Sequence, residues 1–188
     1  MDPTRGVGPF SAAAMAPTPT PFTPRLEMRD ITAPADFRGT KVIVGVMGGG
    51  AWGAISEVIS SGSVASFGAN QVFGHKSGDS TTWIYGIQPP QDGNIERWAH
   101  DKYVEILREA SRRATTAAPF MISLPLLGTG NLGLSVKTSI DAFYHAWQFV
   151  DRESSLAGKV FPCLVDRERA KCDEIYGILN PPAPGPKR

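Results

Sequence analysis

Apolar residues are arranged along this chain in two patterns, short continuous runs and longer segments with helical spacing. A short β-branched run without alternation is typical of a strand that is buried on both faces of a parallel sheet. Such runs predict strands at 41–46, 82–87, 120–126 and 159–165, with an edge strand at 26–31. Apolar residues at three- and four-residue steps predict helices at 95–114 and 136–150, and two further helices are expected at 51–61 and 168–179. Because strands and helices alternate, the predicted fold class is α/β, with a sheet that is covered on both faces.

Proline is concentrated at the two ends of the chain, and at the start it is mixed with Ala and Thr. Closely spaced Pro and Thr favour an extended, hydrated chain that forms neither a helix nor a central strand. We therefore expect a disordered Pro-rich arm at 1–24, one folded domain at 25–179 and a disordered tail at 180–188.

The charge balance and the absence of long apolar runs restrict the class of protein. The chain has 188 residues with 19 Lys and Arg against 18 Asp and Glu, which gives a formal net charge of +1. Such a chain lacks the excess positive charge of proteins that coat nucleic acid, so nucleic acid is not indicated as a partner. No apolar run reaches the roughly 20 residues of a membrane span, and the start does not resemble a signal peptide. The sequence thus predicts a soluble intracellular monomer, cytoplasmic or nuclear, with no membrane partner.

Cysteine and histidine give little support for metal or redox chemistry. The cysteines, Cys163 and Cys172, are too few for a disulfide scaffold or a cysteine-ligated zinc site, and we expect buried free thiols. The histidines, His75, His100 and His145, are scattered and do not have the HExxH spacing. We therefore expect no metal and no cofactor. No Ser-His-Asp or Cys-His arrangement identifies a catalytic residue.

Two of the predicted strand-to-helix junctions, at 47–54 and 127–133, are rich in glycine. A helix N-terminus presents unpaired N–H groups and a partial positive charge, and glycine lets the backbone approach a phosphate closely. Both loops are expected at the carboxyl ends of parallel strands, where open α/β sheets usually bind ligands. Two such loops that face one crevice suit a diphosphate held by backbone N–H groups; the other explanation is that the glycines only make tight turns.

The second loop also matches the dinucleotide pattern G-x-G-x-x-G, through Gly128, Gly130 and Gly133. This match raises a nicotinamide-dinucleotide oxidoreductase as an alternative, with Asp151 or Asp166 as the ribose-binding acid. However, that pattern normally opens a Rossmann domain, whereas here one predicted strand remains downstream. It also leaves the glycines at 48–50 unexplained, so this alternative is the weaker one. The chain has no GxxxxGK[ST] motif, which argues against a P-loop NTPase.

Four segments, in this order and spacing, resemble the macro domain family. They are Arg29-Asp30-Ile31-Thr32, the stretch 42–55 (VIVGVMGGGAWGAI), the strand at 83–89, and the loop at 125–133 (PLLGTGNLG). The resemblance covers about 26–179. It implies a three-layer α/β/α fold with a mixed, mostly parallel central sheet. It also implies a partner, which is ADP-ribose, either free or attached to a protein.

The resemblance further implies which residues bind the ligand. Asp30 is expected to accept the adenine amino group, and the Ile31 backbone to lie beside the adenine. The first glycine loop is expected near the distal ribose and the diphosphate, and the second loop around the diphosphate. The implied ligand-binding set is Asp30, Ile31, Gly49, Gly50, Ala51, Trp52, Gly128, Thr129, Gly130, Asn131 and Leu132.

The sequence departs from the family pattern at the positions linked to catalysis. Hydrolytic members usually carry an N-A-A-N segment after the strand, whereas here the strand runs directly into the glycines. Trp52 stands where these hydrolases tend to have Asp, and it is expected either to stack on the ribose or to anchor the core. Leu132 replaces an aromatic residue in the second loop. A binding function is therefore preferred, an ADP-ribosyl hydrolase is the alternative, and the catalytic residues stay unassigned.

Overall fold

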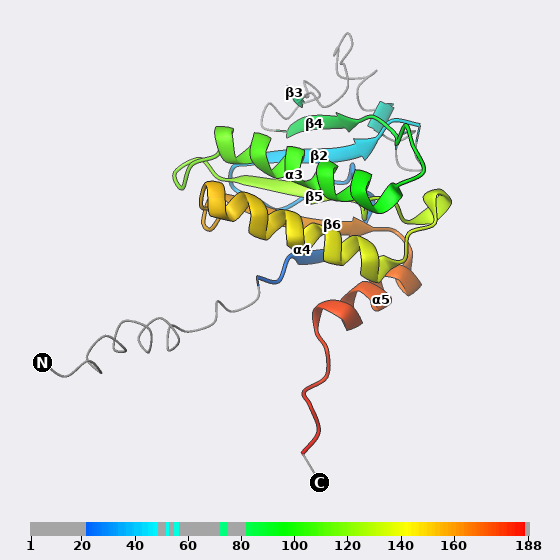
Figure 1. Ribbon diagram of the computed structural model, residues 1–188. Coiled ribbons are helices and arrows are strands. Elements are labelled where there is room, and N and C mark those ends of the chain that lie inside the picture. Colours follow the sequence, from blue (N-terminus) through cyan, green and yellow to red (C-terminus); the bar gives the residue numbers. More distant parts are fainter. Residues whose placement is uncertain (1–21, 49–51, 53–54, 57–71, 75–81, 187–188) are drawn as a thin grey trace, which may run out of the picture.

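Six strands form one twisted sheet at the centre of the fold (Figure 1). The computed structural model describes residues 22–48, 52, 55–56, 72–74 and 82–186. The strands are β1 (Arg25–Met28), β2 (Thr40–Val46), β3 (Val72–Gly74), β4 (Thr82–Ile87), β5 (Phe120–Leu124) and β6 (Val160–Asp166). Their order across the sheet is β1-β6-β5-β2-β4-β3. All neighbouring strands are parallel except β3, which pairs antiparallel with β4 at one edge. The prediction of a mixed, mostly parallel sheet is confirmed.

Two long helices, α3 (Ile95–Arg113) and α4 (Val136–Glu153), lie side by side over one face of the sheet (Figure 1). Both begin at a capping side chain: Asn94 accepts the N–H of Arg97 at 3.1 Å, and Ser135 accepts the N–H of Thr138 at 3.1 Å. Such caps satisfy backbone donors that a helix N-terminus leaves without a partner. The shorter α5 (Arg169–Leu179) packs beside β1 and against α4.

Two apolar clusters cover the two faces of the sheet, as expected for a three-layer α/β/α fold. Alternate residues of each strand belong to different clusters, because successive side chains of a strand point to opposite faces. On β2, Val42 and Val44 pack under α3 and α4, whereas Ile43 packs on the other face. That second face is covered by Ile31 and by helical residues at 52 and 55. The predicted α/β/α layering is confirmed.

Most of the predicted elements occur close to where the apolar pattern places them. The strand predicted at 82–87 is β4, and the helix predicted at 95–114 ends one residue earlier, at Arg113. The strand β3 was not predicted. The helix predicted at 51–61 is described only at residues 52, 55 and 56, which are helical.

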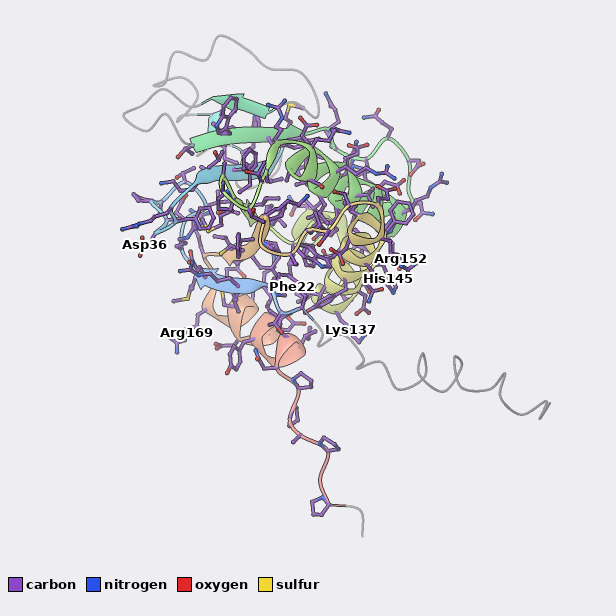
Figure 2. The ribbon with its side chains drawn as sticks, turned by 90° about the vertical axis from the view of Figure 1, so that its left-hand side faces the viewer. Phe22, Asp36, Lys137, His145, Arg152 and Arg169 are labelled. Carbon is purple, nitrogen blue, oxygen red and sulfur yellow. The ribbon has the colours of Figure 1, made fainter. Side chains whose placement is uncertain are left out.

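The described chain begins at Phe22 (Figure 2). Its ring stacks on Trp147 of α4 with a centroid distance of 4.2 Å. Lys137, His145 and Arg152 lie along α4 (Figure 2). Within the described ranges, no helix is long and apolar enough to cross a membrane. The predicted boundaries at residues 24 and 180 stay predictions.

Candidate functional site

The carboxyl ends of β1, β6, β5 and β2 lie next to one another, because these four strands are consecutive and parallel in the sheet. In Figure 1 the arrowheads of β2, β4 and β6 point to the same side, where the chain leaving β5 makes a long loop. The segments that follow these strands contain the residues predicted to bind a ligand. The fold therefore gathers the described ones, Asp30, Ile31 and residues 128–132, along one edge of the sheet, as is usual for ligand sites in open α/β sheets.

The loop that follows β5 is shaped by three glycines in the left-handed backbone region. Gly128, Gly130 and Gly133 have φ values of +83°, +80° and +82°, which L side chains rarely adopt. The glycines at 130 and 133 differ from Gly128 in their surroundings, since a Cβ added at either position meets nothing within 4 Å. A Cβ at Gly128, by contrast, would lie 2.4 Å from Leu134 Cδ1. Gly128 thus allows close packing at the base of the loop, whereas Gly130 and Gly133 face open space.

Backbone donors at the tip of this loop are available to a ligand. Gly130–Leu132 form one 3-10 turn, which closes with a bond from the Gly133 N–H to the Gly130 carbonyl. Within the part of the chain that the structure describes, the N–H groups of Gly130 and Asn131 have no hydrogen-bond acceptor. Both residues are exposed, as is Leu132, whose exposed fraction is 37%. Unpaired N–H groups at the start of a helical turn are a common way of binding an anion.

A buried ring of hydrogen bonds holds the base of the loop against α3 and α4. The Leu127 N–H donates to Tyr103 Oη at 2.8 Å, and the Ser139 hydroxyl donates to the Leu127 carbonyl at 2.6 Å. Because the Ser139 proton is used in this way, the Tyr103 hydroxyl is the donor in its 2.8 Å bond to Ser139 Oγ. The Tyr103 and Ser139 side chains are completely buried. Burial raises the pKa of Tyr103 to about 12, so the phenol keeps its proton.

The hydroxyl of Thr129 is engaged within the protein on both sides. It donates to the Leu126 carbonyl at 2.9 Å and accepts from Lys171 Nζ at 2.8 Å. Lys171, in the first turn of α5, also pairs with the Asp166 carboxylate at 3.1 Å. A lysine side chain therefore connects the loop after β5 to the end of β6.

Asp30 lies just beyond β1 and forms a tight turn with Thr32. Its Oδ1 accepts the Thr32 hydroxyl at 2.6 Å and the Thr32 N–H at 2.9 Å. The Thr32 hydroxyl bond, its backbone bond and the charge of Arg167 together lower the pKa of Asp30, although partial burial opposes them. The side chain is 37% exposed, and its other oxygen lies 3.7 Å from Arg167. The ionised carboxylate is thus accessible as an acceptor.

Arg29 fixes the segment that carries Asp30 to the middle of the sheet. Its guanidinium donates to Ser123 on β5 at 3.0 Å and to Glu27 at 2.5 Å. It also reaches the carbonyls of Asp30 and Ile31 at 3.3 and 3.4 Å. Although partial burial acts to raise the pKa of Glu27, the hydrogen bond and charge of Arg29 hold it below its ordinary value. The position of the Asp30 turn therefore depends on an interaction between Arg29, the residue after β1, and Ser123 of β5.

The first glycine loop is described as far as Gly48, which also has a positive φ of +78°. Gly49, Gly50 and Ala51 lie outside the described residues. Trp52 is partly buried and packs on the second face of the sheet. A Cβ on Gly45 would lie 3.1 Å from its ring, so the indole rests directly on β2.

Two solved structures are similar in fold to this chain. An alphavirus structure titled "Alphavirus P23pro-zbd" matches with a TM-score of 0.56 and 12% identity, over 84% of this chain and 23% of that one. An alanine-substituted mutant of the Oceanobacillus iheyensis macrodomain matches with a TM-score of 0.57 and 14% identity, over 82% of this chain and 89% of that one. The protein has a macro-domain fold. No protein-family profile and no curated protein sequence matches the chain.

The macro-domain fold brings together the described part of the predicted site at one edge of the sheet. Asp30, Ile31 and the loop residues 128–132 all follow the carboxyl ends of parallel strands, and Ile31 has its side chain in the core. Within the described residues, no group of three or more His, Cys, Asp or Glu side chains is placed to hold a metal ion. Cys163 and Cys172 are buried free thiols, as predicted.

The sequence reasoning did not single out the side chains that hold this site of the macro-domain fold in position. They are Arg29, Tyr103, Ser139 and Lys171. Two of these side chains have an unusual position that can be recognised from the sequence pattern. Ser139 is a polar residue on the apolar stripe of α4. Lys171 is a cation in the first turn of a helix, where the helix dipole favours anions.

Proposed function

We propose that this protein binds ADP-ribose, either free or attached to a protein, across the carboxyl edge of the sheet. The observation that carries the proposal is the loop after β5. Its tip combines N–H groups that have no acceptor among the described residues with open space above Gly130. A diphosphate is the group that such a loop accommodates best, because several backbone donors converge on its oxygens.

The turn at the end of β1 supports an adenine at the other end of the ligand. An ionised carboxylate accepts hydrogen bonds and donates none, so Asp30 suits the amino group of adenine. This turn follows β1 and the phosphate-binding loop follows β5, two positions away across the sheet, with β6 between them. With the strands of a sheet about 4.8 Å apart, this separation suits a dinucleotide-sized ligand better than a single phosphate. The resemblance of the motifs and the macro-domain fold point to the same ligand.

Isothermal titration calorimetry with ADP-ribose, ribose 5-phosphate and NAD tests the proposal. We expect ADP-ribose to bind and to raise the melting temperature, since a ligand of the folded state stabilises it by mass action. Ribose 5-phosphate, which lacks adenine, is expected to bind more weakly. The absence of heat and of thermal stabilisation with ADP-ribose would refute the proposal, and NAD binding as tight as that of ADP-ribose would favour the oxidoreductase alternative.

Asp30→Ala tests the orientation of the ligand. Loss of the carboxylate should reduce the preference for ADP-ribose over ribose 5-phosphate, while Asp36→Ala, at an exposed position in the 31–37 loop, should not. An unchanged preference in Asp30→Ala would place the adenine elsewhere.

Incubation with an ADP-ribosylated protein tests the hydrolase alternative. Steady release of free ADP-ribose, followed by chromatography, would show that the protein is an enzyme. Binding without release supports the binding function, which is the one we prefer, because the positions usual for catalysis are altered in the sequence.

A further inference from the structure

Lys171 contacts both the loop after β5 and the end of β6. Its Nζ lies 2.8 Å from Thr129 Oγ1 and 3.1 Å from Asp166 Oδ2, and its side chain is 22% exposed. An ammonium group has three N–H donors. Two are used in these contacts, and the third has no acceptor among the described residues. Lys171 therefore contacts the loop while keeping one donor available.

Thr129 is the residue that the sequence would nominate as the side-chain donor of this loop. Its single hydroxyl proton is donated to the Leu126 carbonyl at 2.9 Å, and its oxygen accepts from Lys171. In this geometry the Thr129 hydroxyl has no proton left for a phosphate oxygen. The Lys171 ammonium, which contacts Thr129 next to the unpaired N–H groups of Gly130 and Asn131, is a side-chain donor at this loop that still has a proton to give.

Lys171 is held by an ion pair with the Asp166 carboxylate. Asp166 accepts the Glu168 N–H through Oδ1 and Lys171 through Oδ2, so its carboxylate is satisfied without the third Lys171 donor. The main-chain carbonyl of Asp166 accepts the Arg29 N–H at 3.0 Å, which links this pair to the segment carrying Asp30. The ion pair thus lies between the two parts of the proposed site and is held from both sides.

We propose that Lys171 is a phosphate-binding residue that supplies a bound diphosphate with the charged side-chain donor that Thr129 is not free to give. This inference rests on the proposed function. With Lys171 in this role, the affinity of the loop for a ligand depends on the charge of the ligand as well as on the backbone N–H groups. Hydrogen bonds between ammonium and phosphate are stronger than those between neutral groups, so Lys171 contributes to affinity for phosphate and not for adenosine.

Lys171→Met tests the inference because it keeps most of the aliphatic stem and removes the charge. We expect ADP-ribose to bind at least about tenfold more weakly by calorimetry, whereas adenosine, which has no phosphate, binds as it does to the wild type. Lys171→Arg keeps the charge and should restore most of the affinity. The matched control is Arg169→Met, which removes one positive charge from the same turn of α5 at an exposed position (Figure 2). Its affinity should change less than about twofold, as expected for an exposed charge.

A second measurement needs no variant of Lys171. Reductive methylation of the wild-type protein, read by mass spectrometry, should be slowed at Lys171 by saturating ADP-ribose. It should be unaffected at Lys137, which is exposed on α4 (Figure 2). This readout stands even where Lys171→Met does not fold.

The outcomes separate the two proposals. If the wild type binds no ADP-ribose, both the proposed function and the role of Lys171 are wrong. If the wild type binds but Lys171→Met retains full affinity, or if Arg169→Met loses as much, only the role of Lys171 is wrong. Equal methylation of Lys171 with and without ADP-ribose would contradict it in the same way.

Discussion

The Tyr103 hydroxyl donates a 2.8 Å hydrogen bond to Ser139 Oγ, and these two side chains together satisfy both backbone groups of Leu127. Tyr103 lies on α3 and Ser139 on α4, so the first residue of the glycine loop is bonded to both helices of one layer. Buried backbone groups that lack a partner are costly, which makes this ring a fixed point from which the loop extends.

Tyr103→Phe is expected to destabilise the protein by about 1–3 kcal/mol, because it leaves the buried Leu127 N–H without an acceptor. Ser139→Ala leaves the Leu127 carbonyl unpaired and should have a similar effect. Since both changes break the same ring, the double variant should lose clearly less stability than the sum of the two. Chemical denaturation of the four proteins measures this coupling.

Tyr144→Phe, on α4, is the control for removal of a phenol hydroxyl. Tyr144 is partly buried and its hydroxyl has no hydrogen-bond partner among the described residues, so the change should cost less than about 0.5 kcal/mol. Strict additivity of Tyr103→Phe and Ser139→Ala would mean that the ring does not act as a unit.

Gly130→Glu is expected to abolish ADP-ribose binding, since it places bulk and negative charge in the open space of the loop. The positive φ of +80° costs any L residue stability, roughly 1–2 kcal/mol. Gly158→Glu introduces the same charge at a φ of +74°, near the amino end of β6, and serves as the control. Both variants should melt lower, but only Gly130→Glu should lose binding by calorimetry. Retained affinity in Gly130→Glu would show that the loop is not the phosphate site.

Because of Asp30, the stability of the fold is expected to fall at acidic pH. Its pKa is lowered below the ordinary value of 3.8, chiefly by the Thr32 hydroxyl bond, so the folded state favours the ionised form. This contribution is fully present above the ordinary pKa and is lost as the pH falls through the lowered value. The difference in melting temperature between wild type and Asp30→Asn should therefore shrink on acidification below about pH 4. A difference that is the same at acidic and neutral pH would contradict this linkage.

Cys163 and Cys172 are expected to be unreactive in the folded protein. Burial raises the pKa of Cys163 to about 11 and also raises that of Cys172, so little thiolate exists near neutral pH. The thiolate is the nucleophile, and both side chains are buried. Ellman's reagent should react slowly with the native protein and rapidly with both thiols after unfolding. A fast native reaction of either cysteine would mean that its segment opens readily.

The sequence predicted most of the elements because buried parallel strands and amphipathic helices have strong local patterns. The strand at 82–87 was predicted with the bounds that β4 has, and α3 to within one residue. In contrast, β5 ends at Leu124 rather than at residue 126. Leu126 is apolar because it is buried beneath the loop, and an apolar run does not distinguish a strand from a buried loop residue. The short edge strand β3 lies in a stretch rich in Gly and Ser that has no strand pattern.

The glycine positions of the candidate site were also available from the sequence, since left-handed turns require a particular residue type. Gly128, Gly130 and Gly133 all have the positive φ that makes glycine necessary. The resemblance placed Thr129 in the ligand-binding set, but its contact with Lys171 depends on how α5 packs beside the loop and was not predictable.

The amino-acid sequence by itself determined the strands, the helices and the glycines at which the chain turns, because each depends on residues that are near one another in the chain. Only the tertiary structure decided which side chains hold the site in place. Tyr103 and Ser139 are 36 residues apart, Thr129 and Lys171 are 42 apart, and Arg29 and Ser123 are 94 apart. Each pair meets because of the order β1-β6-β5-β2 in the sheet and the packing of α3, α4 and α5 around it. That order arises from the burial of the whole core, which no local pattern of residues specifies.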